Sequence, residues 1–522
     1  MSVKYIFVLL LAGFFIKNGN AADTGKDFVF TFAYDSSLSL SRSAIANVIV
    51  IPLFNDTLCT FTYIQNSDNK IVTLQQKAIY NQTNEFKLNV DEVVVQFDYG
   101  QSKFEDYSTK DFRIFVSCTE EVKLIARIAD AVQGWGDMHL VYSVTNAATR
   151  YSSFQVPISD TNFKGTLGIL PINKGGSIKV NIIGYINEQL FSQQTIEYNT
   201  TLGQNQHYIG IYFDKLNGEP SSYNINASIA ITATSPIMLS FESPQTTTSN
   251  IDDDGSCGSV CYNDFVQFMP VASQPIDCNL DFTTPDQRMI TSEFTSRLHI
   301  SPPNFGDDCD AIPKIIVYND LLSVEGSEQI VDKTGFTRIS LNNIQYAGFS
   351  TNNGQMTTNR FGSLFQPDFG GITAYGHFMH YVPSIQEWLI NETQFYTLPK
   401  HCLLEIYAED DDSNAIHSIT IDGIPLDGNI VNKAGFDPVA AAKGFFAFVV
   451  MFFTSLLNPI LSLAPSGRSN GNTSGSGGFR SGGSSGSGGN GGSRRRGNNI
   501  NQLPPTSDIS SAPCSSGGCC GS

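Results

Sequence analysis

Two segments of this chain repeat one pattern of apolar and polar residues. The sequence DFVQFMP at 264–270 and the sequence HFMHYVP at 377–383 each run on to a phenylalanine and a closing proline. A fainter third copy begins at Asp137 and ends with an aromatic residue and a proline at similar offsets. The copies are too far apart for a short solenoid repeat and fit a tandem module or the blades of a propeller. We therefore expect one β unit to be built several times.

Alternation of apolar residues with polar or small residues is found throughout the body of the chain. It is clear at 28–32 and at 178–182, whereas helical periodicity is almost absent. Phenylalanine and tyrosine are abundant and turns are rich in Asn, Asp and Gly. The pattern predicts an all-β protein of tandem modules, sandwich-like or closed into a propeller-like ring. The expected modules cover residues 22–162, 163–302 and 303–436.

The amino terminus carries the features of a secretory signal peptide. Lys4 precedes an apolar run over residues 5–16, and small residues occupy the positions that end at Ala21. We place the signal peptide at 1–21, so the rest of the chain is expected to enter the secretory pathway. Five Asn-X-Ser/Thr sequons lie in polar stretches and are candidate glycosylation sites there, namely Asn55, Asn81, Asn199, Asn226 and Asn391.

The body of the chain contains an odd number of cysteines. An oxidising compartment favours disulfides, so most should pair and one is left free or bonded to another chain. Cys257 and Cys261 are close enough to close a small loop, and the absence of a second close pair or a nearby histidine disfavours a zinc site there. The other pairings stay open. The disulfide candidates are Cys59, Cys118, Cys257, Cys261, Cys278, Cys309 and Cys402.

An uncharged apolar stretch covers residues 444–463. About 20 residues at roughly 1.5 Å each match a hydrocarbon core of roughly 30 Å, so the stretch predicts one transmembrane helix. Asn458 and Pro459 near its end are unfavourable in lipid unless they lie at the interface. The alternative is a buried strand pair or a core helix that closes the last module.

The composition changes abruptly after the apolar stretch. Residues 466–522 are rich in Gly, Ser and Arg and carry three cysteines, Cys514, Cys519 and Cys520. A segment of this kind cannot bury a core, so we expect a disordered tail. If the tail is cytosolic, its thiols are reduced and open to acylation or metal binding, although low-complexity tails also collect cysteines without a use.

Several segments resemble the N-terminal domain of the IgGFc-binding protein family, particularly its nematode-like members. They are DFVFTFAYDSS at 27–37, SPIMLSFES followed by DFVQFMPV at 235–271, and the segments at 377–398 and 403–426. The resemblance implies an extracellular, non-enzymatic binding domain associated with mucus or cell surfaces. Its motifs define no ligand-binding residues. After residue 426 the apolar stretch and the Gly/Ser tail replace the mucin-like repeats of larger relatives.

No catalytic or metal-binding motif stands out, so we expect no catalytic residues, no metal and no cofactor. None of the seven histidines has a convincing partner, and His377 and His380 are predicted to face opposite sides of a strand. The acidic clusters at 252–254 and 409–412 lack EF-hand spacing and are interpreted as solvated loops. Paired carboxylates of a glycoside hydrolase converge only in the fold, which leaves that class open.

The net charge of −18 at pH 7 disfavours nucleic acid and anionic glycans as partners. Three functions are compatible with the sequence. The first is a single-span cell-surface protein whose modules bind an extracellular protein or glycan. The second is a secreted mucus or matrix protein whose apolar stretch belongs to its core. The third is a glycan-processing enzyme on a β scaffold.

Overall fold

The structure is a computed structural model. It describes residues 23–98, 104–156, 163–213, 227–246, 260–261, 264–278, 281, 283–292, 294–305, 309–319, 325–341, 344, 346–368, 371–388, 393–396, 403–409, 419–421, 424–425, 431–434 and 447–453. The predicted signal peptide and tail lie outside these residues. So do the following candidate positions: Asn226, Asn391, Cys257, Cys402 and the acidic cluster at 252–254.

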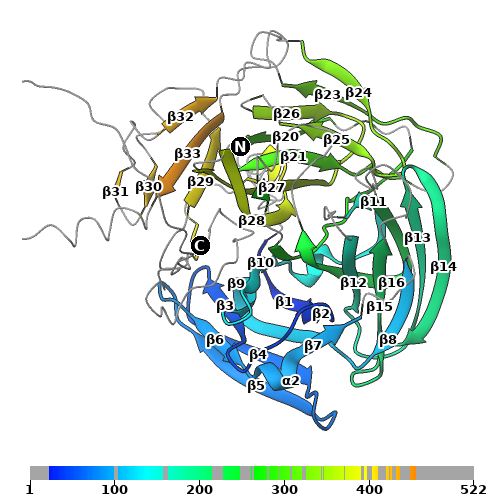
Figure 1. Ribbon diagram of the computed structural model, residues 1–522, viewed down its shortest axis with the longest axis vertical. Coiled ribbons are helices and arrows are strands. Elements are labelled where there is room, and N and C mark those ends of the chain that lie inside the picture. The colour runs from blue at the N-terminus through cyan, green and yellow to red at the C-terminus, as the bar shows by residue number, and fades with distance from the viewer. Residues whose placement is uncertain are drawn as a thin grey trace, which may run out of the picture.

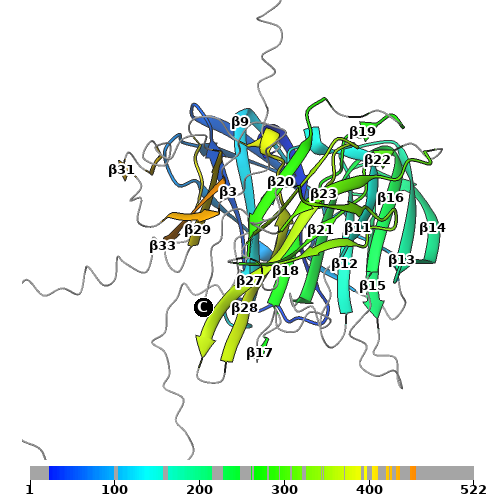
Figure 2. The ribbon, with the colours of Figure 1, turned by 90° about the horizontal axis from the view of Figure 1, so that it is seen from above.

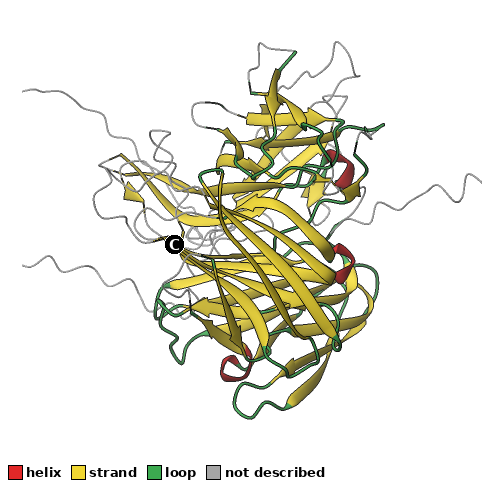
Figure 3. Ribbon diagram, turned by 90° about the vertical axis from the view of Figure 1, so that its right-hand side faces the viewer, coloured by secondary structure: helices red, strands yellow, loops and turns green. Residues whose placement is uncertain are grey.

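The predicted all-β fold is confirmed. Strands make up nearly all the regular structure of the described residues, and Figure 3 shows helices only as short turns. The α-helix α2, Val90–Val93, is capped by Asn89, whose side chain accepts the backbone N–H of Asp91. Two 3-10 turns, Val144–Asn146 and Ile385–Glu387, each follow one of the repeated blocks.

The first sheet has seven strands in the order β5-β4-β9-β3-β6, with β1 and β10 also paired to β9. The long strand β9 is central because β1, β3, β4 and β10 all pair antiparallel with it. A separate parallel pair, β2 and β7, lies close in sequence. The bounds are β1 Gly25–Phe30, β2 Phe32–Asp35, β3 Ile45–Pro52, β4 Thr57–Ile64, β5 Ile71–Ala78, β6 Glu85–Leu88, β7 Val94–Phe97, β9 Ile114–Asp130 and β10 Trp135–Val141.

The second sheet has eight strands in the order β14-β13-β16-β12-β15-β8, with β11 and β18 paired to β16. Its long strand β16 has the central role that β9 has in the first sheet. Strands β8 and β11 come from the segment predicted as the first module but pair in this sheet. The bounds are β8 Glu105–Thr109, β11 Ala148–Gln155, β12 Phe163–Pro171, β13 Ser177–Ile186, β14 Gln189–Asn199, β15 Gln206–Phe213, β16 Ala227–Thr246 and β18 Asp264–Phe268.

The third part of the chain forms a five-stranded sheet, β17-β28-β27-β21-β25, and a four-stranded sheet, β20-β26-β23-β24. A short parallel pair, β19 and β22, accompanies them. The bounds are β17 Val260–Cys261, β19 Pro275–Ile276, β20 Asp286–Thr291, β21 Thr295–Ile300, β22 Asn304–Phe305, β23 Lys314–Tyr318, β24 Ser327–Ile330, β25 Thr337–Ser340, β26 Tyr346–Thr351, β27 Thr358–Asp368 and β28 Gly371–Tyr381.

The sheets follow one another around a common centre, from blue through teal to green in Figure 1. The repeated blocks are the strands β10, β18 and β28, which we call the repeated strands. Each pairs with a long strand of its own sheet, and β18 contacts both β10 and β28. In Figure 2, β18 lies beside β28. The repetition seen in the sequence is therefore the element that brings the sheets together.

The part of the apolar stretch 444–463 that the structure describes is a strand and not the expected helix. Residues Ala447–Phe453 form strand β33, which pairs with β29 (Leu403–Glu409) and β32 (Val431–Ala434). Valine and phenylalanine favour strands, which accounts for the strand at these residues. No helix among the described residues is long and apolar enough to cross a membrane. The small hairpin β30 (Thr420–Ile421) and β31 (Ile424–Pro425) lies nearby in sequence.

The repeated strands also share side chains between cores. Phe265 and Met269, which follow the start of the second block, belong to the core of the first sheet, as does Tyr381 from the third block. Met379 from the third block belongs to the core of the second sheet. Each sheet therefore buries residues that a later part of the chain supplies, and folding one unit alone leaves gaps in its core.

Two disulfides form among the candidate cysteines, whose pairing the sequence analysis left open. Cys59 and Cys118 face each other on β4 and β9 and are bonded, and Cys278 is bonded to Cys309. Cys261 lies in β17, but its side chain is not described. Both bonds close loops in the unfolded chain and so reduce its entropy.

Buried Asp-X-Arg pairs tie loops to sheets, and the sequence reasoning missed them. Arg113 and Asp111 are fully buried and form a two-bond ion pair at 2.8 Å. The Arg113 guanidinium also donates to the carbonyls of Pro171, Asn173 and Thr200 at 2.9 to 3.1 Å. This arginine therefore joins the start of β9 to the loops of the second sheet.

The pair at Asp286 and Arg288 repeats this arrangement. Arg288 donates to Asp286 at 3.1 Å and to the carbonyl of Val382, and Asp286 accepts the backbone N–H of Met356. Its signal in the sequence is the recurrence of one Asp-X-Arg spacing, just before β9 in the first pair and at the start of β20 in the second.

We predict that Arg113→Ala lowers the free energy of unfolding by about 3–5 kcal/mol, because it leaves Asp111 as a buried, uncompensated charge. Urea unfolding of the full chain measures this. Lys70→Ala is the control, since Lys70 pairs with Asp68 on the surface and its loss should leave the midpoint unchanged. A small effect of Arg113→Ala would contradict the assigned role.

Candidate functional site

The repeated strands form a polar junction at the centre of the molecule. The carboxyl of Asp137 on β10 accepts the backbone N–H of Met138 at 2.6 Å and the backbone N–H of Gln267 on β18 at 2.7 Å. Gln267 in turn donates its amide to the carbonyl of Thr31 at 3.1 Å and to Ser240. One carboxyl thus links strands that lie far apart in the sequence.

Asp264 holds the same position in the second block. Its carboxyl accepts the backbone N–H of Phe265 at 2.8 Å and is hydrogen-bonded to the backbone N–H of His377 on β28. In the third block His377 takes the position of the aspartate, and its side chain is fully buried. The junction therefore uses two aspartates to join three strands.

The acids of the junction are held in surroundings that disfavour charge. Burial raises the pKa of Asp137 and of Asp264 well above the usual range, and the hydrogen bonds from backbone N–H groups oppose this only in part. Burial, with the nearby Asp35, also raises the pKa of Glu242, which accepts a hydrogen bond from Thr166 at 2.7 Å. Burial raises the pKa of Asp35 to about 6.

Three histidines are buried in the neutral form. Burial lowers the pKa of His139 to about 3, and neither ring nitrogen has a hydrogen-bond partner among the described residues. Burial and the nearby Arg360 lower the pKa of His380 to about 3. Burial, Arg297 and Arg338 lower the pKa of His299. Neutral histidines away from solvent cannot exchange protons with a substrate at the surface.

The junction does not have the geometry of a hydrolase site. Asp137 is buried and both its carboxyl oxygens accept backbone hydrogen bonds, and the Asp264 carboxyl is likewise engaged by backbone N–H groups. A glycoside hydrolase needs two carboxyls with access to a sugar. Within the described part of the chain, no group of three or more His, Cys, Asp or Glu side chains is placed to hold a metal.

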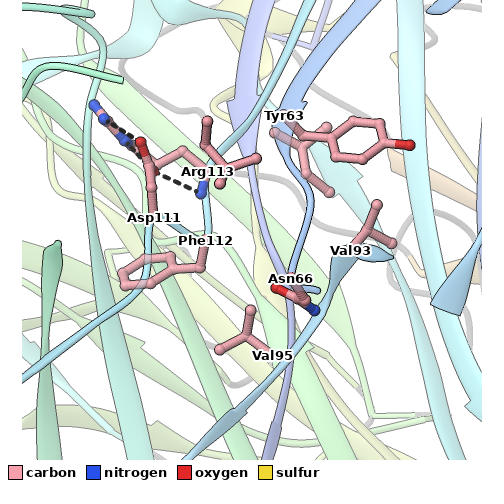
Figure 4. A pocket seen from close by; sticks show the side chains of 9 residues that line it. Tyr63, Asn66, Val93, Val95, Asp111, Phe112 and Arg113 are labelled. Atoms are coloured by element: carbon pink, nitrogen blue, oxygen red, sulfur yellow. Dashed lines mark hydrogen bonds and ion pairs between the residues drawn. The ribbon is translucent and has the colours of Figure 1, made fainter. Parts of the chain in front are cut away.

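Figure 4 shows a depression next to the first sheet, between the end of β4, α2, β7 and the loop before β9. It is lined by Tyr63, Asn66, Val95 and other residues, and the Asp111 and Arg113 pair lies at its edge with the dashed ion pair drawn. The space is too tight for a water molecule. It is packing around the buried arginine and not a ligand pocket.

The surface carries the sequons that the structure describes. Asn55, Asn81 and Asn199 are all exposed. Asn81 lies three residues past the end of the edge strand β5 and Asn199 is the last residue of the edge strand β14, in matching sequences QQKAIYNQT and QQTIEYNTT. The sequence analysis missed this second repeat because its apolar pattern is weak, although the two segments have several identical residues at the same positions.

One family model matches the chain, and it covers only the C-terminal region. Residues 439–518 match the family described as Selenoprotein SelK_SelG. A comparison with curated proteins found no significant match to the chain. The matched segment begins after β32 and contains β33 as its described part.

We predict a pH-dependent contribution from Asp35. Its folded-state pKa of about 6 lies above its unfolded-state value, so its stabilising effect is present below about pH 4 and is lost as the pH rises to 6. Relative to Asp35→Asn, the wild type should lose about 2.5 kcal/mol of unfolding free energy between pH 4 and pH 7. Asn keeps the oxygen that accepts the N–H of Ser37.

Urea midpoints of both proteins at several pH values measure this difference. The buried histidines are the same in both proteins, so their opposing effect on stability cancels in the difference. Asp27→Asn, on the exposed side of β1, is the control. A wild-type minus Asp35→Asn difference that does not change with pH would show that the Asp35 carboxyl titrates as in the unfolded chain.

Proposed function

We propose that this protein is an extracellular, non-enzymatic binding or adhesion protein of the IgGFc-binding N-terminal domain type. The observation that carries the proposal is the separation of roles between interior and surface. Acids and histidines with shifted pKa lie inside, where the two aspartates of the junction bind backbone N–H groups, while the exposed face of the edge strand β14 carries Gln193, Thr195 and Asn199 beside Glu197.

The outer face of the second sheet illustrates such a surface. Thr195 on β14 donates to Asn181 on β13 at 2.6 Å, and Asn181 donates to Thr232 on β16 at 3.3 Å. The first sheet presents a similar row on β4 and β5, where Thr60 faces Gln75. Hydroxyl and amide groups in fixed rows suit recognition of a protein or glycan surface.

We propose further that a single membrane span anchors the body at the cell surface. The apolar residues 444–463 support this proposal, since they are uncharged and long enough for a helix across the hydrocarbon core. The family match from residue 439 supports a C-terminal region that is distinct from the β body.

A secreted mucus or matrix protein is the second candidate. Strand β33 favours it, because Ala447–Phe453 pair with β29 and β32 in a sheet and so use part of the apolar stretch within the body. In that form the stretch closes the last sheet and does not cross a membrane.

The sequon at Asn472, just beyond the apolar stretch, separates the two candidates. We predict that a full-length protein with a C-terminal epitope, made in sealed microsomes, has an unglycosylated tail that protease removes from outside. Glycosidase digestion and protease protection measure this. A protected tail with a glycan at Asn472 would exclude the span and leave the secreted protein. Glycosylation of Asn81 in the same sample is the control for entry of the body.

A further inference from the structure

Three exposed apolar side chains converge at one end of the first sheet. Phe54, in the loop between β3 and β4, is 70% exposed, Ile79 after β5 is 36% exposed, and Phe395 is 45% exposed. Leu58 at the start of β4 adds to them. We call these four residues the apolar end. Single exposed apolar residues are ordinary, but a group of them on one site needs an explanation.

Polar contacts fix the three segments next to one another. Asp56 accepts the backbone N–H of Tyr80 at 3.1 Å and pairs with Lys77 at 2.9 Å, which ties the Phe54 loop to the turn after β5. Gln394 donates to the side-chain oxygen of Asn81 at 3.0 Å, which brings the segment of Phe395 to the same turn. Specific hydrogen bonds and an ion pair therefore hold the segments of the apolar end next to one another.

Two of these segments carry a sequon beside the apolar side chain. Asn55 follows Phe54 directly, and Asn81 lies two residues after Ile79; both asparagines are exposed. The hydrogen bond from Gln394 uses only the oxygen of Asn81, so the side-chain nitrogen stays available. An N-acetylglucosamine ring has an apolar C–H face that packs on aromatic and aliphatic side chains.

We propose that N-linked glycans at Asn55 and Asn81 cover the apolar end, with their first sugars packed on Phe54 and Ile79. In the modification, the side-chain nitrogen forms a bond to C1 of the sugar and loses one proton. The bond from C1 to the pyrophosphate of a lipid-linked oligosaccharide breaks, and the lipid pyrophosphate leaves. The inference rests on the proposed extracellular location, because this donor acts in the secretory pathway.

Asn199 provides a matched control. It occupies the equivalent place in the matching sequence, as the last residue of β14, yet the exposed Phe191 on that strand lies eight residues away, roughly 27 Å along the strand. A glycan at Asn199 therefore has no large exposed apolar neighbour of this kind on its own strand, and its loss should change nothing at the apolar end.

The test is hydroxyl-radical footprinting of the full chain expressed in a secretory host, with site occupancy measured by glycopeptide mass spectrometry. We expect Asn55 and Asn81 to be occupied, and oxidation of Phe54 to rise several-fold in the Asn55→Gln, Asn81→Gln double variant. Oxidation of Phe191 should stay the same in that variant, and oxidation of Phe54 should stay the same in Asn199→Gln.

Two results would overturn the inference. One is occupied sites with unchanged oxidation of Phe54 in the double variant, which would leave the apolar end open to another partner. The other is an occupied Asn199 with Asn55 and Asn81 empty. If all three sites are empty, the extracellular proposal fails as well, so the two failures are distinguishable.

Discussion

The hydrogen bonds that the Asp137 and Asp264 carboxyls accept from backbone N–H groups of the next repeated strand are the constraint on which the rest of the fold depends. Each bond is made within a junction that excludes water, where a lost partner leaves a buried polar group unsatisfied. The strands β10, β18 and β28 are consequently held relative to one another by contacts that do not involve the outer strands of each sheet.

Sharing of core residues follows from this junction. Phe265 and Tyr381 reach the core of the first sheet because their strands are held against β10. The Asp-X-Arg pairs add a second set of links, in which the buried Arg113 and Arg288 donate to backbone carbonyls of neighbouring segments. The sheets are thus joined by the repeated strands and by these buried arginines.

The sequence predicted the elements better than the contacts. Period-two alternation at residues such as 178–182 identified the strands because one face of each strand is buried. The repeated blocks were found because the residues around Asp264 recur in the sequence. The hydrogen-bond partner of Asp137 is Gln267, which is 130 residues away, and no local sequence pattern predicts this contact. The expected helix over 444–463 is a strand at Ala447–Phe453, since an apolar run satisfies either structure.

Native-state hydrogen exchange of the full chain tests the central claim most directly. The amides of Gln267 and His377, which bind the two carboxyls, should exchange with the same free energy of opening as the central strands β9 and β16. This result would mean that the repeated strands open together as one unit. Exchange of the three repeated strands at clearly different free energies would contradict the account and indicate modules that unfold independently.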